Sequence, residues 1–161
     1  LTMLLNVSAL HYVKCDSTFR LRRTYLGTSH TFVVTNSAEL SRRPSVLIIE
    51  NDALVAEMIA EMVSELGYGL AGRAHDTQSA HQALRSDRYD VVLLDMLLQG
   101  QKGDELADLL QRNKTPHAFV IGYSEIKPPY DKVPLLIKPF SAEQLRLLLH
   151  HLVGPPAHAR V

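Results

Sequence analysis

The chain reads Ser45-Val46-Leu47-Ile48-Ile49-Glu50-Asn51-Asp52 at the point where an apolar run gives way to a polar one. A short and almost unbroken apolar run is typical of a β-strand that is buried on both faces. Its abrupt end in an acid, an amide and a second acid marks the end of the strand. The stretch therefore predicts a buried strand with Glu50, Asn51 and Asp52 at its carboxyl end.

The same signature returns later in the chain. Val91–Leu94 is a second apolar run, and it ends at Asp95. Weaker strand patterns occupy residues 70–74, 118–121 and 133–137, and Lys138 follows the last of them. Together with the first run, these patterns predict five strands.

Helical patterns separate the predicted strands. From residue 55 to 66, apolar side chains recur at helical spacing with glutamates on the opposite face, and Gly67 follows as a stop signal. Asp76 can cap a second helix, and a leucine pattern over residues 106–110 marks a third. Ser141 and Gln144 form a capping box ahead of the last helix.

This alternation predicts an α/β fold, with a doubly wound five-stranded parallel sheet and helices on both faces. In open sheets of this kind, ligands bind at the edge where the strands end. The polar residues of the sequence gather at that edge, so we expect them to converge in one crevice: Glu50, Asn51, Asp52, Asp95, Ser124 and Lys138.

The first part of the chain differs from the rest. Residues 1–44 have no sustained hydrophobic period and hold six Lys or Arg against two Asp or Glu, whereas the remainder holds 11 against 15. We interpret them as a basic tail that is disordered or follows from a wrongly assigned start, with a marginal strand at residues 31–34. The predicted domain spans residues 45–153, and residues 154–161 form a C-terminal tail.

The composition limits the classes of partner and compartment. Lys plus Arg and Asp plus Glu number 17 each, so no overall field favours nucleic acid or an anionic membrane surface. Cys15 is the only cysteine, which excludes an intrachain disulfide and fits a reducing compartment. Residues 1–10 are too short to span a bilayer and lack the basic start of a signal peptide. We expect a cytoplasmic protein without nucleic-acid or membrane partners.

The converging polar residues suggest phosphoryl chemistry. Carboxylates gathered at one edge repel each other and need a compensating cation. Mg²⁺ prefers oxygen ligands and keeps several waters, which suits Glu50, Asn51, Asp95 and a nearby backbone carbonyl. With Lys138 as a fixed positive charge opposite, Asp95 can attack a phosphoryl donor, because both cations neutralise the oxygens of the transferring group. Asp52 either supports the metal or caps the first helix.

These residues resemble the CheY-like response regulator receiver family, which carries an acidic cluster after strand one, an Asp that ends strand three and Lys-Pro after strand five. Lys138-Pro139-Phe140 is the most specific part of the likeness, which covers residues 45–153. The resemblance implies a flavodoxin-like fold and a cis bond before Pro139. It also implies a set of site residues: Asp95 as phosphoacceptor, Lys138 as the phosphoryl contact, and Mg²⁺ held by Glu50, Asn51, Asp95 and the backbone carbonyl of Leu97.

A finer likeness concerns the fourth strand. Residues 116–123 look like the F-A-T-G-Y stretch of a receiver subclass that is common as single-domain proteins in alphaproteobacteria, and residues 133–138 agree with it. Pro128 and Pro129 disfavour a regular helix between the fourth and fifth strands, where most receivers have their fourth helix. We therefore expect that helix to be short or absent.

Three positions depart from the family pattern. Asn51 stands where the family has a carboxylate, so metal affinity should fall. Ile121 stands where the family has Thr or Ser, whose hydroxyl bonds the phosphoryl oxygen when the domain switches, and Leu135 replaces an aromatic residue coupled to that movement. A hydrogen bond to a charged group contributes about 1.5 to 3 kcal/mol, so its loss predicts that phosphorylation switches this domain weakly.

The resemblance implies a bacterial two-component response regulator rather than an enzyme, which accepts phosphoryl from a sensor histidine kinase or a histidine phosphotransfer protein. Output would pass to an unknown partner protein by contact. One alternative is a pseudo-receiver that binds proteins without phosphorylation, as Asn51 and Ile121 allow. Another is a metal-dependent phosphohydrolase with Asp95 as nucleophile, although that chemistry often places a second acid where this chain has Leu97.

Overall fold

The computed structural model describes residues 3–5, 19–26, 29–36, 42–86, 88–98, 101–122 and 129–156. The chain divides into two units, Leu1–Arg42 and Arg43–Val161. The first unit holds an antiparallel sheet, and the second is built on a parallel one.

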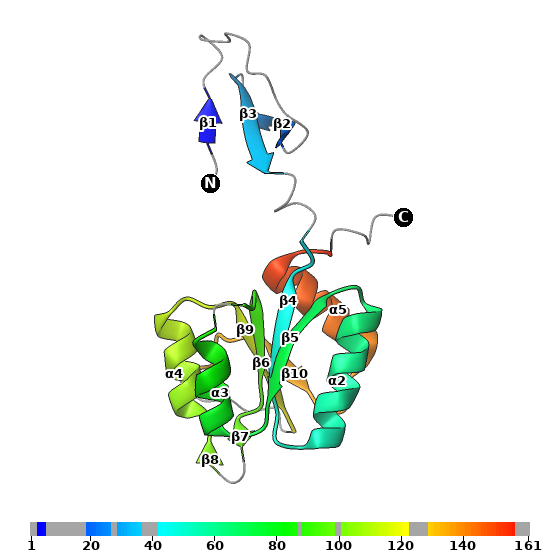
Figure 1. Cartoon of the computed structure of the whole chain (residues 1–161), viewed down its shortest axis with the longest axis vertical. Coiled ribbons are helices and arrows are strands. Elements are labelled where there is room, and N and C mark those ends of the chain that lie inside the picture. Colours follow the sequence, from blue (N-terminus) through cyan, green and yellow to red (C-terminus); the bar gives the residue numbers. More distant parts are fainter. Residues whose placement is uncertain are drawn as a thin grey trace. The chain divides into compact units, whose positions relative to one another are not determined.

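The first unit contains three strands in the order β1-β3-β2 (Figure 1). They are β1 (Met3–Leu5), β2 (Phe19–Leu26) and β3 (Ser29–Asn36). The marginal strand expected at residues 31–34 is part of β3, and it has a neighbour on each side, which supplies the backbone hydrogen bonds that an isolated strand lacks. The structure has strands in these three segments, while the interpretation of residues 1–44 as a tail and the domain boundary at residue 44 stay predictions.

The second unit contains a five-stranded sheet in the order β10-β9-β6-β4-β5. All four pairings between neighbouring strands are parallel. The strands are β4 (Ser45–Ile49), β5 (Gly69–Ala74), β6 (Val91–Leu94), β9 (His117–Ile121) and β10 (Leu135–Ile137). The predicted α/β fold with a five-stranded parallel sheet is confirmed.

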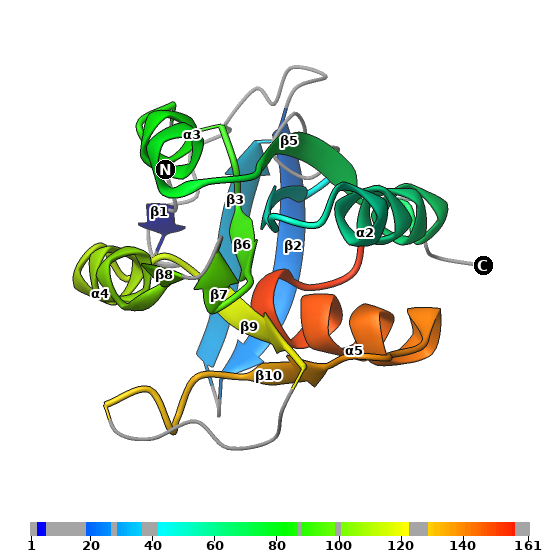
Figure 2. The same cartoon turned by 90° about the horizontal axis from the view of Figure 1, so that it is seen from below.

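Four helices of the second unit cover both faces of this sheet. They are α2 (Ala53–Glu65), α3 (Thr77–Leu84), α4 (Asp104–Arg112) and α5 (Ala142–Val153). Figure 2 shows α2 and α5 on one face of the sheet and α3 and α4 on the other. Among the described residues, no helix has both the length and the apolar character needed to cross a membrane.

The sheet separates two hydrophobic cores. Alternate residues of a strand point to opposite faces. In β4, Val46 and Ile48 pack in the core under α2 and α5, while Leu47 and Ile49 pack in the core under α3 and α4. All four side chains are at most 2% exposed. A strand that is buried on both faces needs an apolar residue at every position, which is why unbroken apolar runs predicted β4 and β6.

Local signals set the ends of the helices. The carboxylate of Asp52 accepts hydrogen bonds from the backbone N–H groups of the first turn of α2. Gly67 follows that helix with a φ of +83°, a left-handed conformation that glycine adopts without strain. Asp76 and Ser141 close capping boxes at the starts of α3 and α5. These helix ends confirm the stop and caps that the sequence predicted.

Two local features were not predicted. β10 begins at Leu135 instead of Val133, because the N–H of Val133 donates to the carbonyl of Tyr130 at 3.0 Å in a turn. Directly after the site edge, β7 (Leu97–Leu98) and β8 (Gln101–Lys102) pair as a small antiparallel hairpin. Strands this short carry no readable hydrophobic period.

The expectation of a short or absent fourth helix is not borne out. The described residues of the second unit hold four helices, of which α5 follows the fifth strand and corresponds to the predicted last helix. Between β9 and β10, residues 129–133 form turns and bends, and residues 123–128, which include Ser124 and Pro128, lie outside the described residues. Proline limits where a helix can run, but a pair of prolines does not by itself exclude one.

Candidate functional site

Three charged side chains meet at the carboxyl edge of the parallel sheet. Glu50 follows β4, Asp95 follows β6 and Lys138 follows β10. Ile49 is paired with Leu94 in the sheet, so the two acids leave neighbouring strands side by side. The structure thus brings together three of the six residues that were expected to converge.

Lys138 joins the two acids. Its backbone N–H donates to the carbonyl oxygen of Ile121 at the end of β9 (2.7 Å), which fixes the point where the chain leaves the sheet. Its Nζ donates to Oε2 of Glu50 at 2.6 Å and to Oδ2 of Asp95 at 2.8 Å. The peptide bond to Pro139 is cis, as the resemblance implied. One ammonium group therefore bridges two carboxylates.

Both carboxylates are buried, and each has a second partner. Glu50 is 2% exposed and Asp95 7% exposed. The backbone N–H of Asp52 donates to Oε1 of Glu50 (3.1 Å), and the N–H of Leu97 donates to Oδ1 of Asp95 (2.9 Å). Buried charges are tolerated when they are paired and hydrogen-bonded in this way.

The charges at the site act on one another. Burial raises the pKa of Glu50, and the nearby Asp95 charge adds to this, against the hydrogen bonds from Lys138 and Asp52. Burial by itself lowers the pKa of Lys138, but its hydrogen bonds to Asp95 and Glu50 outweigh that effect and raise it. Lys138 therefore carries a fixed positive charge, and the three groups with both acids ionised keep one negative charge in excess.

Asn51 and Asp52 lie at the same edge but outside this cluster. Asn51 is exposed directly after Glu50. The Asp52 carboxylate is directed to the helix, where its Oδ1 accepts from the N–H groups of Leu54 (2.9 Å) and Val55 (3.2 Å). Of the two roles left open for Asp52, the structure has the helix cap.

Gly103, which the sequence analysis did not single out, lies close to the backbone of Asp95. Gly103 immediately precedes α4, and a Cβ on it would lie 3.2 Å from the carbonyl oxygen of Asp95 and 3.3 Å from Cα of Met96. Such contacts are tighter than nearly all normal packing, so a side chain at this position would require the start of α4 or the backbone of Asp95 to shift by a few tenths of an ångström. The residues next to Gly103 in the sequence do not predict this contact, because the contact depends on how α4 packs in the fold.

The two positions that the resemblance marks as altered switch positions, Ile121 and Leu135, lie on β9 and β10. Ile121 is fully buried in the core under α3 and α4. Leu135 is partly buried and packs against the same core. At the position where the family carries a hydroxyl, this chain has an apolar side chain in van der Waals packing. The structure gives no hydrogen-bonding group at these two side chains.

The oxygen ligands at this edge suit a hard divalent cation, but only two carboxylates are placed to bind it. Glu50 and Asp95 supply carboxylate oxygens at one edge, as Mg²⁺ prefers. Across the described part of the chain, no group of three or more His, Cys, Asp or Glu side chains is placed to hold a metal. A metal here would rely on two carboxylates, with amide, backbone and water oxygens completing its ligands.

Comparisons with known proteins agree with this geometry. The model of the response regulator receiver domain family matches residues 46–150. Among curated proteins, the transcriptional regulatory protein MalR of Bacillus subtilis is 34% identical over 113 residues, which cover 65% of this chain and 48% of MalR. The transcriptional regulatory protein PdtaR of Mycobacterium tuberculosis is 28% identical over 117 residues, covering 69% of this chain and 57% of PdtaR. The chain thus spans about half the length of the curated relatives it matches.

Two solved structures show the same fold. The receiver domain of the PhyR response regulator from Erythrobacter litoralis is 28% identical with a TM-score of 0.61, covering 70% of this chain and 91% of that domain. SdrG from Sphingomonas melonis superimposes with a TM-score of 0.62 over 69% of this chain and 97% of its own, at 24% identity, and supports the fold alone. Receiver domains typically bind Mg²⁺ and in general receive their signal from a histidine kinase. Because the family model covers well over half of the sequence, the chain belongs to the response regulator receiver family of two-component signalling, a signalling module rather than a classical enzyme.

Proposed function

We propose that this receiver domain accepts a phosphoryl group on Asp95 from a phosphohistidine donor. The observation that carries the proposal is the position of the Lys138 ammonium group, 2.8 Å from Oδ2 of Asp95 and 2.6 Å from Oε2 of Glu50. A carboxylate beside a fixed positive charge, at the ligand-binding edge of an open sheet, is the arrangement that phosphoryl transfer to an acid requires.

In the transfer, a carboxylate oxygen of Asp95 attacks the phosphorus atom. A P–O bond forms while the P–N bond to the donor breaks, and the imidazole, protonated on its other nitrogen, leaves as a neutral ring. The N–H of Leu97, 2.9 Å from Oδ1, fixes the orientation of the carboxylate. Lys138 neutralises part of the charge on the transferred group.

Glu50, Asn51, Asp95 and the backbone carbonyl of Leu97 would hold Mg²⁺. The bound ion would supply positive charge to the phosphoryl oxygens. Because Asn51 contributes no charge, we expect weaker Mg²⁺ binding than in a receiver with a carboxylate at that position. The two buried carboxylates beside Lys138 support this ligand assignment.

The partners and the subclass follow from the same proposal. The donor would be a sensor histidine kinase or a histidine phosphotransfer protein, and output would pass by contact from the domain at residues 45–153 to another protein. Residues 116–123 support membership of the F-A-T-G-Y subclass through the likeness noted above. Similarity to the PhyR receiver domain, at 28% identity, is in keeping with that assignment.

A second candidate function is a pseudo-receiver that binds its partner without phosphorylation. The observation that favours it is Ile121, which is fully buried and cannot donate a hydrogen bond to a phosphoryl oxygen. Under this alternative the domain keeps the receiver fold and binds its partner, but phosphorylation does not change its conformation.

Intact-mass measurement separates the two functions. The full chain is incubated with Mg²⁺ and a small acyl-phosphate donor, beside Asp95→Asn and the matched control Asp131→Asn, an exposed aspartate. We expect the mass of one phosphoryl group on the parent and on the Asp131 variant, and none on the Asp95 variant. An adduct on the Asp95 variant would place the phosphoryl elsewhere. A folded parent without adduct would leave the pseudo-receiver as the function.

A further inference from the structure

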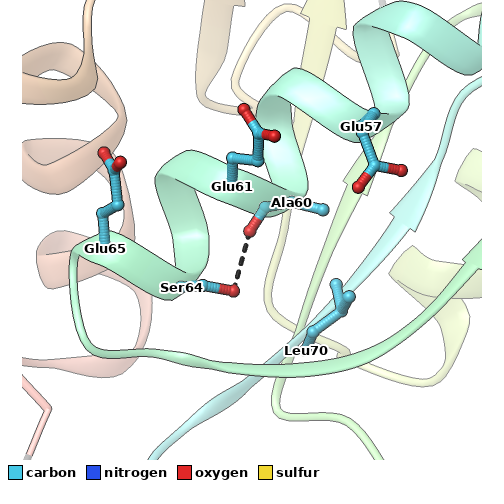
Figure 3. Close-up of a pocket in the computed structure, with 6 residues that line it drawn as sticks. All are labelled: Glu57, Ala60, Glu61, Ser64, Glu65 and Leu70. Atoms are coloured by element: carbon cyan, nitrogen blue, oxygen red, sulfur yellow. Dashed lines mark hydrogen bonds between the residues drawn. The ribbon is translucent and has the colours of Figure 1, made fainter.

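A groove lies between α2 and β5, on the outer side of the sheet. Its volume is about 490 Å³, and it is lined by Glu57, Ala60, Glu61, Ser64, Glu65 and Leu70. Figure 3 shows the three glutamates following one another along α2, with Leu70 across from them on β5. A volume of this size matches clefts that hold a small ligand or a few residues of a peptide.

The helix wall of the groove carries uncompensated negative charge. Glu57 forms an ion pair with Arg73 of β5, whereas Glu61 and Glu65 have no cationic partner among the described residues. The three glutamates are spaced four residues apart, so neighbours on the helix repel each other. Glu65 is also the last residue of α2, whose final turn holds no basic residue, and an acid at a helix C-terminus opposes the helix dipole.

The opposite wall is an edge strand with an exposed apolar side chain. β5 is the last strand of the sheet on its side, so one of its edges has no neighbouring strand among the described residues. Leu70 is 43% exposed at the start of this strand. The groove therefore has acidic side chains on one wall and the apolar side chain of Leu70 on the other, which suits an occupant with both characters.

The spacing of the charges selects the shape of the occupant. Four residues of α-helix advance by about 6 Å, the separation of successive glutamates along α2. Every second residue of an extended chain is separated by about 6.6 Å. An extended segment with a basic residue at every second position would therefore match Glu61 and Glu65, and its intervening residues would face the other wall.

We propose that the α2–β5 groove binds an extended segment of a partner protein in which basic and apolar residues alternate. Its Lys or Arg side chains pair with Glu61 and Glu65, and an apolar side chain between them packs on Leu70. The β4–β5 register shifts between Val46 and Leu47 and leaves Ala71 of β5 without a partner in β4, an irregularity that disfavours a regular added strand, so recognition runs through side chains. The groove and Asp95 are separate sites, and the binding does not depend on phosphorylation.

The test uses a fluorescent peptide of alternating Lys and Val residues, titrated with the full chain in an anisotropy measurement. The double variant Glu61→Gln and Glu65→Gln should weaken binding by about tenfold, as expected when two exposed ion pairs are lost. The matched control, Glu105→Gln with Asp131→Asn, removes two exposed acids elsewhere in the second unit and should change affinity by less than about twofold. Leu70→Ser should also weaken binding, while Asp95→Asn should bind as the parent does.

Several results would overturn the proposal. One is failure of the parent chain to bind the peptide, and another is an equal loss of affinity in the control variant, which would mean a general field effect. Equal binding of a peptide with the same composition but its lysines in one block would remove the spacing argument. If sedimentation shows that copies of the chain associate and that the glutamine variant separates them, the occupant is a second copy and not a basic partner segment.

Discussion

The backbone N–H of Lys138 donates to the carbonyl oxygen of Ile121 at 2.7 Å, so the lysine proposed to contact the phosphoryl group is anchored to the strand that carries the proposed switch position. Ile121 itself is fully buried. The main chain of β9 thus reaches the site even though its last side chain offers no polar group.

Ile121→Thr should lower the free energy of unfolding by about 1 to 3 kcal/mol, because it buries a hydroxyl in an apolar core and removes packed atoms. The same variant should show a larger rise in Tm than the parent when Mg²⁺ and an acyl phosphate are added, because the hydroxyl can donate to the phosphoryl group. Ile121→Val loses packing without gaining a donor and serves as the control. An equal rise in Tm for all three proteins would contradict the switch assignment.

Lys138→Met should lower the free energy of unfolding by about 3 kcal/mol, the lower end for breaking a buried ion pair. We choose the lower end because the Lys138 side chain is 23% exposed. The variant loses stability because the buried carboxylates of Glu50 and Asp95 then repel each other without the ammonium group between them. Urea denaturation measures the change, with the exposed Lys132→Met as control, and equal stability of the two variants would argue against the bridge.

Asn51→Asp should raise the affinity for Mg²⁺ by about tenfold, because a charged oxygen ligand replaces a neutral one. Without metal the variant should be less stable than the parent, because it adds a like charge near Glu50 and Asp95. Isothermal titration with Mg²⁺ and thermal unfolding in chelator measure the two effects. Unchanged affinity would place the metal ligands elsewhere.

Gly103→Ala should slow phosphorylation at Asp95 and cost about 1 to 3 kcal/mol of stability, because the added Cβ would press on the Asp95 carbonyl oxygen at 3.2 Å. Gly122→Ala is a matched control, since a Cβ there meets no atom of the described residues within 4 Å. Time-resolved intact mass and urea denaturation compare the two variants. Equal behaviour of both would show that α4 can move away from Asp95 without consequence.

Tyr130 should destabilise the fold at high pH. Burial, followed by its hydrogen bond to Asp108, raises the pKa of Tyr130 to about 12 from an ordinary value of 10.0. A group whose pKa is raised in the folded state contributes stability below the unfolded pKa and loses it as the pH rises through the folded value. Stability should therefore fall between pH 10 and 12. Tyr130→Phe should flatten that part of the profile, as measured by denaturation at each pH; an unchanged profile would assign the effect to other groups.

Much of the fold could be predicted because its signals are local. The apolar run that ends at Glu50 predicted β4, and Gly67, Asp76 and Ser141 predicted helix ends that the structure has. Each of these features depends on residues within a few positions of one another. A reader of the sequence therefore obtains them without knowing the tertiary structure.

The remainder depends on contacts between distant residues. The approach of Gly103 to Asp95 follows from where α4 packs, and no local pattern encodes it. Asp52 was open to two roles, because a carboxylate after a strand is suited both to a metal and to a helix start, and only its contacts decide for the cap. The structure clusters Glu50, Asp95 and Lys138, but their chemistry stays a prediction.

Successive side chains of β9 pack in opposite cores, so the strand connects the packing on the two faces of the sheet. Ala118 and Val120 face one core, and Phe119 and Ile121 face the other. A displacement of β9 that loosens packing on one side must compress the other, because both cores are close-packed. A displacement of the end of β9 that is hydrogen-bonded to Lys138 should therefore alter the packing of the helices on both faces of the sheet.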